Sequence, residues 1–163
     1  MGKTIVVIDG MGGGVGAQLI AKLKEQAGRP GDREIIALGT NSTATERMLK
    51  AGANRGATGE NAIKVSVSRG DLILGPIGIV IPNSLMGEIT VEIALAVLSA
   101  PGGKILLPLQ QDHFCIAGIE TMPLAKALDR AVELAEENLR NEPGCLMVKL
   151  PDRKLHEADS GYR

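Results

Sequence analysis

Five glycines crowd a short stretch that directly follows an apolar run. They are Gly10, Gly12, Gly13, Gly14 and Gly16. Glycine lets backbone N–H groups approach a phosphate closely and permits the positive φ angles of a tight turn. A helix beginning at such a turn adds free N–H groups and partial positive charge, which favour an anion. The alternative is that the glycines only let strand and helix pack closely. Their number favours phosphate binding, with Asp9 and Val15 included in the site.

The spacing of these glycines is Gly10-x-x-x-Gly14-x-Gly16. A G-x-G-x-x-G pattern starting at Gly10 fails because Val15 holds the sixth position, and no Gly-Lys-Ser/Thr follows as a Walker loop requires. The spacing resembles the cofactor turn of short-chain dehydrogenases and reductases. The catalytic Tyr-x-x-x-Lys of that family is missing, since the single tyrosine, Tyr162, has no lysine after it. The resemblance therefore implies phosphate binding and not the chemistry of those enzymes.

Polar residues also end the first two expected strands. Asp9 is expected to brace the turn, because a carboxylate beside a phosphate is unfavourable. Thr40, Asn41 and Ser42 stand where dinucleotide folds place an acidic residue for the ribose of NAD. These neutral side chains could accommodate the 2′-phosphate of NADP, with Arg47 nearby, or could serve only as turn and cap residues. The candidate cofactors are NADP, NAD or another nucleotide.

The ends of two later strands add further candidates. Gly75 and Pro76 would let a cofactor lie close to the backbone at the end of the fourth strand. His113 could act as a general acid or base, with Asp112 or Cys115 tuning its pKa. The alternative is that His113 is a loop residue without a catalytic role. No second cluster of possible metal ligands is evident in the sequence, so no metal site is predicted.

A second polar group follows the fourth strand. It consists of Asn83, Ser84 and Glu88. These side chains could contact a ligand or simply cap the next helix.

Apolar runs predict strands over residues 4–9, 34–38, 62–67, 71–74 and 104–109, with a sixth over 114–119. Helical spacing or capping signals predict helices over 15–23, from 43 to about 51, over 88–99 and over 124–139. The helix over 88–99 is apolar on most sides and should be heavily buried. Alternating strands and helices predict an α/β fold: a Rossmann-like, doubly wound, mostly parallel sheet of five to six strands with helices on both faces.

Composition limits the function classes. The net charge of −1 argues against an electrostatic nucleic-acid binder, and two aromatic residues, Phe114 and Tyr162, cannot form a base-stacking platform. Two cysteines give no disulfide scaffold, and we see neither a signal peptide nor a membrane span, so a cytoplasmic location is expected. The length of 163 residues favours one nucleotide-binding domain over residues 1–150 with a flexible tail over 151–163.

Several runs carry a broader resemblance. They are VIDGMGGGVG at 7–16, ALGTNS at 37–42, GATGENA at 56–62, GPIGIV at 75–80 and GEIT at 87–90. In this combination the chain resembles, over roughly residues 4–120, a bacterial family classed only as a domain of unknown function, family 3842. The resemblance implies a Rossmann-like fold and no particular activity.

Three functions remain open. The first is a small nucleotide- or dinucleotide-binding protein whose phosphates lie in the turn of residues 10–16. The second is an NAD(P)-dependent oxidoreductase whose site is completed across an oligomer interface. The third is a structural or interaction subunit without catalysis. Apolar side chains over residues 77–87, among them Ile79 and Ile81, either extend the fourth strand or form a homo-oligomer contact.

Overall fold

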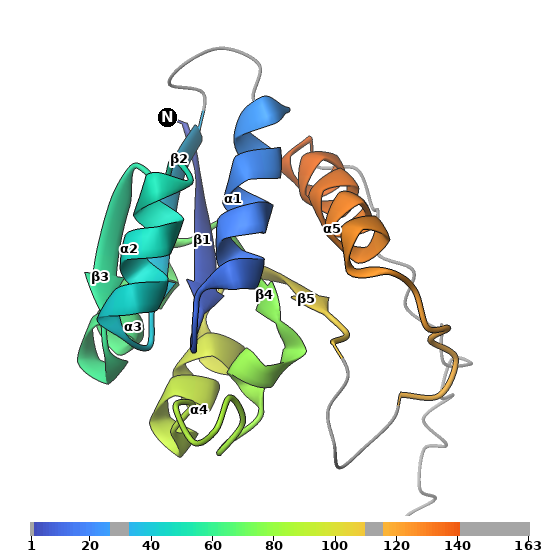
Figure 1. Cartoon of the computed structure of the whole chain (residues 1–163). Helices are drawn as coiled ribbons and strands as arrows, with labels where there is room; N and C mark the ends of the chain where they lie inside the picture. The colour runs from blue at the N-terminus through green and yellow to red at the C-terminus, as the bar shows by residue number, and fades with distance from the viewer. Residues whose placement is uncertain (1, 27–32, 110–115, 141–163) are drawn as a thin grey trace, which may run out of the picture.

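The computed structural model describes residues 2–26, 33–109 and 116–140. Within them, five parallel strands form one sheet in the order β3-β2-β1-β4-β5 (Figure 1). The strands are β1 (Lys3–Asp9), β2 (Arg33–Gly39), β3 (Arg55–Thr58), β4 (Leu72–Pro76) and β5 (Gly103–Leu107). The predicted α/β fold is confirmed, and the order is consistent with a Rossmann-like sheet. The chain reverses its direction across the sheet between β1 and β4, which is where such sheets bind ligands.

Strand β1 lies at the centre of the sheet because its side chains are apolar on both faces. Ile5 and Val7 belong to the core on one face, and Val6 and Ile8 belong to the core on the other. All four are fully buried. A continuous run of this kind is typical of a parallel strand covered on both sides.

Helices cover both faces of the sheet. Helices α1 (Gly14–Glu25), α2 (Ser42–Lys50) and α5 (Leu124–Leu139) pack on one face (Figure 1). Helices α3 (Glu60–Ser66) and α4 (Val91–Ser99) pack on the other, with the short 3₁₀ helices η1 (Val67–Arg69) and η2 (Ile77–Val80). No helix in the described ranges combines the length and the apolar character needed to cross a membrane.

The prediction of a strand over residues 62–67 was wrong. These residues lie in α3 and η1, where Ile63 and Val67 sit four residues apart and are both buried on one helical face. The third strand is β3, at the edge of the sheet beside β2. Its residues, Arg-Gly-Ala-Thr, are exposed or half-buried and have no apolar run that would reveal a strand.

Two helix starts also differ from the prediction. Helix α2 begins at Ser42 with Asn41 as its N-cap, whose Oδ1 accepts a hydrogen bond from the Ala44 N–H at 2.9 Å. Helix α4 begins at Val91, later than expected, because the Thr90 hydroxyl caps it by accepting from the Ile93 N–H at 3.1 Å. Residues 81–90 are therefore a loop between η2 and α4.

Three further expectations need correction. Residues 79–81 do not extend β4, since η2 follows the strand and Ile79 is buried in the core. Residues 116–119 form coil and a turn rather than a sixth strand, and residues 114–115 lie outside the described part. Helix α4 is not buried all round: Val91, Leu95 and Leu98 are 56%, 62% and 56% exposed.

Candidate functional site

The candidate site lies at the carboxyl edge of the sheet, where β1, β2 and β4 end side by side. The segment from residue 10 to 16, here called the glycine turn, leads from β1 into α1 (Figure 1). The Gly13 N–H donates to the Gly10 carbonyl at 2.9 Å and closes it. Met11 and Gly13 have φ angles of 50° and 64°, the left-handed region that a tight turn requires.

Asp9 braces this turn from within. It is 4% exposed, and its carboxylate accepts from the Gly10 N–H at 2.8 Å and from the Gly16 N–H at 2.7 Å. Burial raises the pKa of Asp9, although backbone N–H groups of the turn and the Arg47 guanidinium partly oppose that rise. The carboxylate thus uses donors on the inner side of the turn.

Three of the five glycines are required by packing. A Cβ on Gly13 would lie 2.6 Å from the Ala44 Cα, and one on Gly16 would lie 2.5 Å from the Met48 Sδ. A Cβ on Gly10 would lie 2.6 Å from the Thr40 Oγ1. For these positions, close packing explains the glycine without any ligand.

Gly12 and Gly14 have no such requirement. A Cβ on either would meet only the Arg47 guanidinium, at 3.8 Å from Gly12 and 3.4 Å from Gly14. Neither residue has a positive φ angle. Arg47 is exposed on α2, and its Nη1 donates to the Gly12 carbonyl at 3.1 Å. The open side of the turn therefore carries bare backbone beside a cation.

The residues that end β2 connect it to the glycine turn. The Thr40 N–H donates to the Asp9 carbonyl at 3.1 Å, and the Asn41 Nδ2 donates to the Met11 carbonyl at 3.0 Å. Ser42 is the first residue of α2 and is exposed.

Glu88 joins this group from the loop between η2 and α4. Its Oε2 accepts from the Met11 N–H at 2.7 Å, from the Asn41 Nδ2 at 3.0 Å and from the Thr40 hydroxyl. Burial by itself would raise the pKa of Glu88, but these hydrogen bonds outweigh it and hold the pKa below its usual range. The sequence suggested Glu88 as a ligand contact or a helix cap but did not bring it to the glycine turn, because only the strand order places the loop after β4 beside the ends of β1 and β2.

Gly75 and Pro76 are buried within β4. A Cβ on Gly75 would lie 2.4 Å from the Ile8 carbonyl oxygen, so close packing of neighbouring strands explains this glycine. Asp112, His113 and Cys115 lie outside the described residues. Within the described ranges, no group of three or more acidic, histidine or cysteine side chains is arranged to hold a metal ion.

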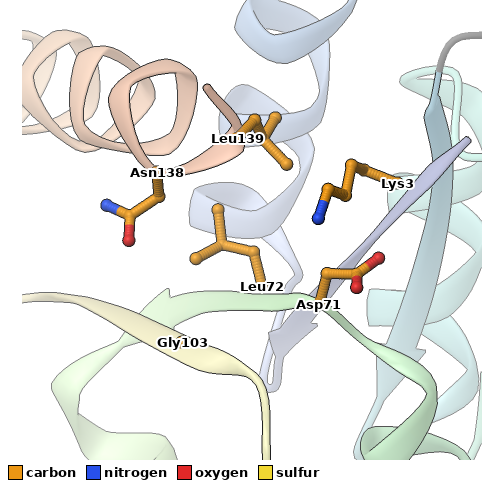
Figure 2. Close-up of a pocket in the computed structure, with 6 residues that line it drawn as sticks. All are labelled: Lys3, Asp71, Leu72, Gly103, Asn138 and Leu139. Carbon is orange, nitrogen blue, oxygen red and sulfur yellow. The ribbon is translucent and has the colours of Figure 1, made fainter. Parts of the chain in front are cut away.

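A pocket of about 160 Å³ lies at the opposite, amino edge of the sheet. It is lined by Lys3, Asp71, Leu72, Gly103, Asn138 and Leu139. Figure 2 shows these side chains coming from the starts of β1 and β4 and from the end of α5. The Asp71 carboxylate also accepts from the Thr4 N–H at 2.8 Å. None of the candidate site residues lines this pocket.

Comparison with models of protein families gives a match. The family model described as Domain of unknown function (DUF3842) matches residues 4–140 and so includes the glycine turn, Arg47 and Glu88. No similar protein was found among the curated proteins. The match covers most of the chain and agrees with the resemblance in the sequence. The chain belongs to the DUF3842 family of domains of unknown function.

Proposed function

We propose that the protein binds a nucleotide or dinucleotide whose phosphates lie against the glycine turn at Gly12 and Gly14. The observation that carries the proposal is that packing does not require glycine at these two positions, since the nearest atoms to a Cβ there, at 3.4 Å or more, belong to the exposed Arg47 guanidinium. Alanine at a compatible position usually stabilises a protein by about 0.4–1 kcal/mol over glycine. Bare backbone here brings the fold no packing benefit, whereas a phosphate needs it for close approach.

Three sources of positive charge meet at this position. They are the backbone N–H groups of Gly12 and Gly14, the amino end of α1 and the Arg47 guanidinium. Arginine suits phosphate because its N–H groups can donate two parallel hydrogen bonds. The Asp9 carboxylate lies on the inner side of the turn, where it positions the loop and leaves the outer side to the ligand.

NAD and NADP are the first candidate ligands, and other nucleotides are included because no reaction is implied by the described residues. A thermal-shift screen should use NAD, NADP, FAD, ATP, ADP, AMP and nucleotide sugars. We expect at least one of them to raise the melting temperature of the wild-type protein. If none does so at millimolar concentration, the proposal is wrong.

Two variants locate the bound phosphate. Gly14→Val should abolish the shift, and it should fold because the nearest atoms to its Cβ, at 3.4 Å or more, belong to the exposed end of the Arg47 side chain. Arg47→Gln should weaken binding about tenfold, as expected for the loss of one charged hydrogen bond. Lys50→Gln is the matched control, since Lys50 is exposed on the same helix and pairs with Glu46 away from the turn. Equal weakening by both charge changes would contradict a phosphate contact at Arg47.

A second candidate function is homo-oligomer formation, which could complete an enzyme site between copies or serve assembly alone. It is favoured by the exposed apolar residues of α4, spaced four and three apart at Val91, Leu95 and Leu98. Met86, in the loop just before this helix, is 90% exposed. An apolar stripe of this kind is typical of a contact surface. The proposed contact between copies therefore lies on α4 and at the end of the 77–87 segment.

A further inference from the structure

The Glu88 carboxylate lies at the carboxyl edge of the sheet, against the residues that follow β1 and β2. Its Oε2 receives three donors, from Met11, Thr40 and Asn41. Among the described residues, its Oε1 receives only the Asn41 Nδ2, at 3.1 Å. A carboxylate has about four acceptor positions in total, shared between its two oxygens. Oε1 therefore keeps acceptor capacity, and the residue is only half-buried.

The loop that carries Glu88 is held in a strained conformation. Asn83, Leu85 and Met86 have φ angles of 63°, 52° and 57°, a left-handed region that non-glycine residues adopt only at an energetic cost. The loop is closed by the Asn83 N–H, which donates to the Ile89 carbonyl at 2.7 Å, and Ile89 is fully buried. In this closed conformation the Glu88 carboxylate lies against the glycine turn, and Met86 is exposed to solvent.

Dinucleotide folds place an acidic residue at the end of the second strand, where its carboxylate accepts hydrogen bonds from the ribose hydroxyls. Here β2 ends at Gly39 and is followed by Thr40, and both residues are neutral. Glu88 brings a carboxylate to the same edge from the far side of β1, and it hydrogen-bonds the residue that follows β2. The acid that the second strand lacks is thus supplied by the loop after η2.

We infer that Glu88 recognises the ribose of the bound nucleotide through its free 2′- and 3′-hydroxyls. The inference rests on the proposed nucleotide binding and adds a ligand class to it. An ionised carboxylate only accepts hydrogen bonds, so it favours hydroxyl donors and repels a 2′-phosphate. Glu88 lies beside Gly10 and Met11, whereas Arg47 lies beside Gly12 and Gly14. The ribose and the phosphates therefore contact different halves of the turn.

Isothermal titration of the wild-type protein with three probes tests this inference. The probes are ADP, 2′-deoxyADP and adenosine 2′,5′-bisphosphate. Removing one hydroxyl that donates a hydrogen bond to a charged acceptor should weaken binding roughly ten- to a hundredfold. We expect ADP to bind more tightly than both other probes. Equal affinity for ADP and 2′-deoxyADP, or tighter binding of the 2′-phosphate, would overturn the role of Glu88 while leaving phosphate binding at the turn intact.

Variants of the acid make the assignment specific. Glu88→Gln should remove most of the preference for ADP over 2′-deoxyADP, and Glu88→Asp should keep part of it. Glu92→Gln should leave the preference unchanged, because Glu92 is an exposed acid that lies four residues further along the chain, in α4. An unchanged preference in Glu88→Gln would overturn the inference. Failure of the wild-type protein to bind any of the three probes would contradict both the inference and the binding of adenine nucleotides at the turn.

Discussion

At the residue scale, the glycine turn contains two kinds of glycine. Gly10, Gly13 and Gly16 are fixed by neighbours closer than a Cβ permits. Gly12 and Gly14 have the exposed Arg47 guanidinium as their nearest neighbour, at a distance that a Cβ would tolerate. The sequence predicted the turn and its neighbours but could not separate these groups, because the separation depends on Ala44, Met48 and Arg47, which lie some 30 residues further along the chain in α2.

Asp9 makes a pH-dependent contribution to stability. Burial raises its pKa in the folded protein above the usual value of 3.8, so the folded state binds a proton more tightly than the unfolded state. This contribution is full below pH 3.8 and is lost as the pH rises through the raised pKa, by about 1.4 kcal/mol for each unit of the shift. We expect wild-type stability to fall relative to Asp9→Asn as the pH rises from about 4 through the raised pKa of Asp9.

Urea denaturation at several pH values measures this difference. Asp9→Asn serves as the reference because its amide does not titrate. The titration of all other groups contributes equally to both proteins and cancels in the difference of unfolding free energy. A difference in unfolding free energy that is constant, or that grows in favour of the wild type with rising pH, would show that Asp9 keeps an ordinary or lowered pKa.

At the element scale, the strands and helices with strong apolar patterns were predicted correctly. Strand β1 and helix α5 follow from a continuous β-branched run and a clear helical stripe. Strand β3 could not be predicted, because an edge strand with the sequence Arg-Gly-Ala-Thr is held by backbone pairing with β2 rather than by its side chains. The start of α4 was placed too early because Leu85, Met86 and Gly87 have left-handed φ angles and the helix begins only after the Thr90 cap.

The exposed face of α4 predicts association between copies of the chain. Leu95 is 62% exposed at the middle of the stripe, so Leu95→Glu should leave the fold intact and shift the protein toward the monomer. Leu49→Glu is the matched control, because Leu49 is also exposed and apolar but lies on α2, on the other face of the sheet. Sedimentation velocity at about 100 µM measures both. A wild-type protein that is already monomeric, or equal effects of the two substitutions, would contradict a contact through α4.

At the scale of the whole molecule, the two edges of the sheet offer different environments. The carboxyl edge has the glycine turn, Arg47 and Glu88, and the amino edge has a pocket bordered by Lys3 and Asp71 (Figure 2). The strand order places the reversal between β1 and β4, and ligands of such sheets bind at the carboxyl ends of the strands. We therefore expect binding at the carboxyl edge, through backbone groups and charge.

The most direct test of phosphate binding at the glycine turn is a ¹⁵N-resolved NMR titration of the wild-type protein with ADP. We expect the largest chemical-shift changes at the amides of Gly12 and Gly14 and at the Arg47 side chain. Smaller changes should occur at Thr40 and Asn41. Changes centred instead on Lys3, Asp71, Gly103 and Asn138 would place the ligand in the pocket at the amino edge. That result, or a spectrum that ADP leaves unchanged, would contradict phosphate binding at the glycine turn.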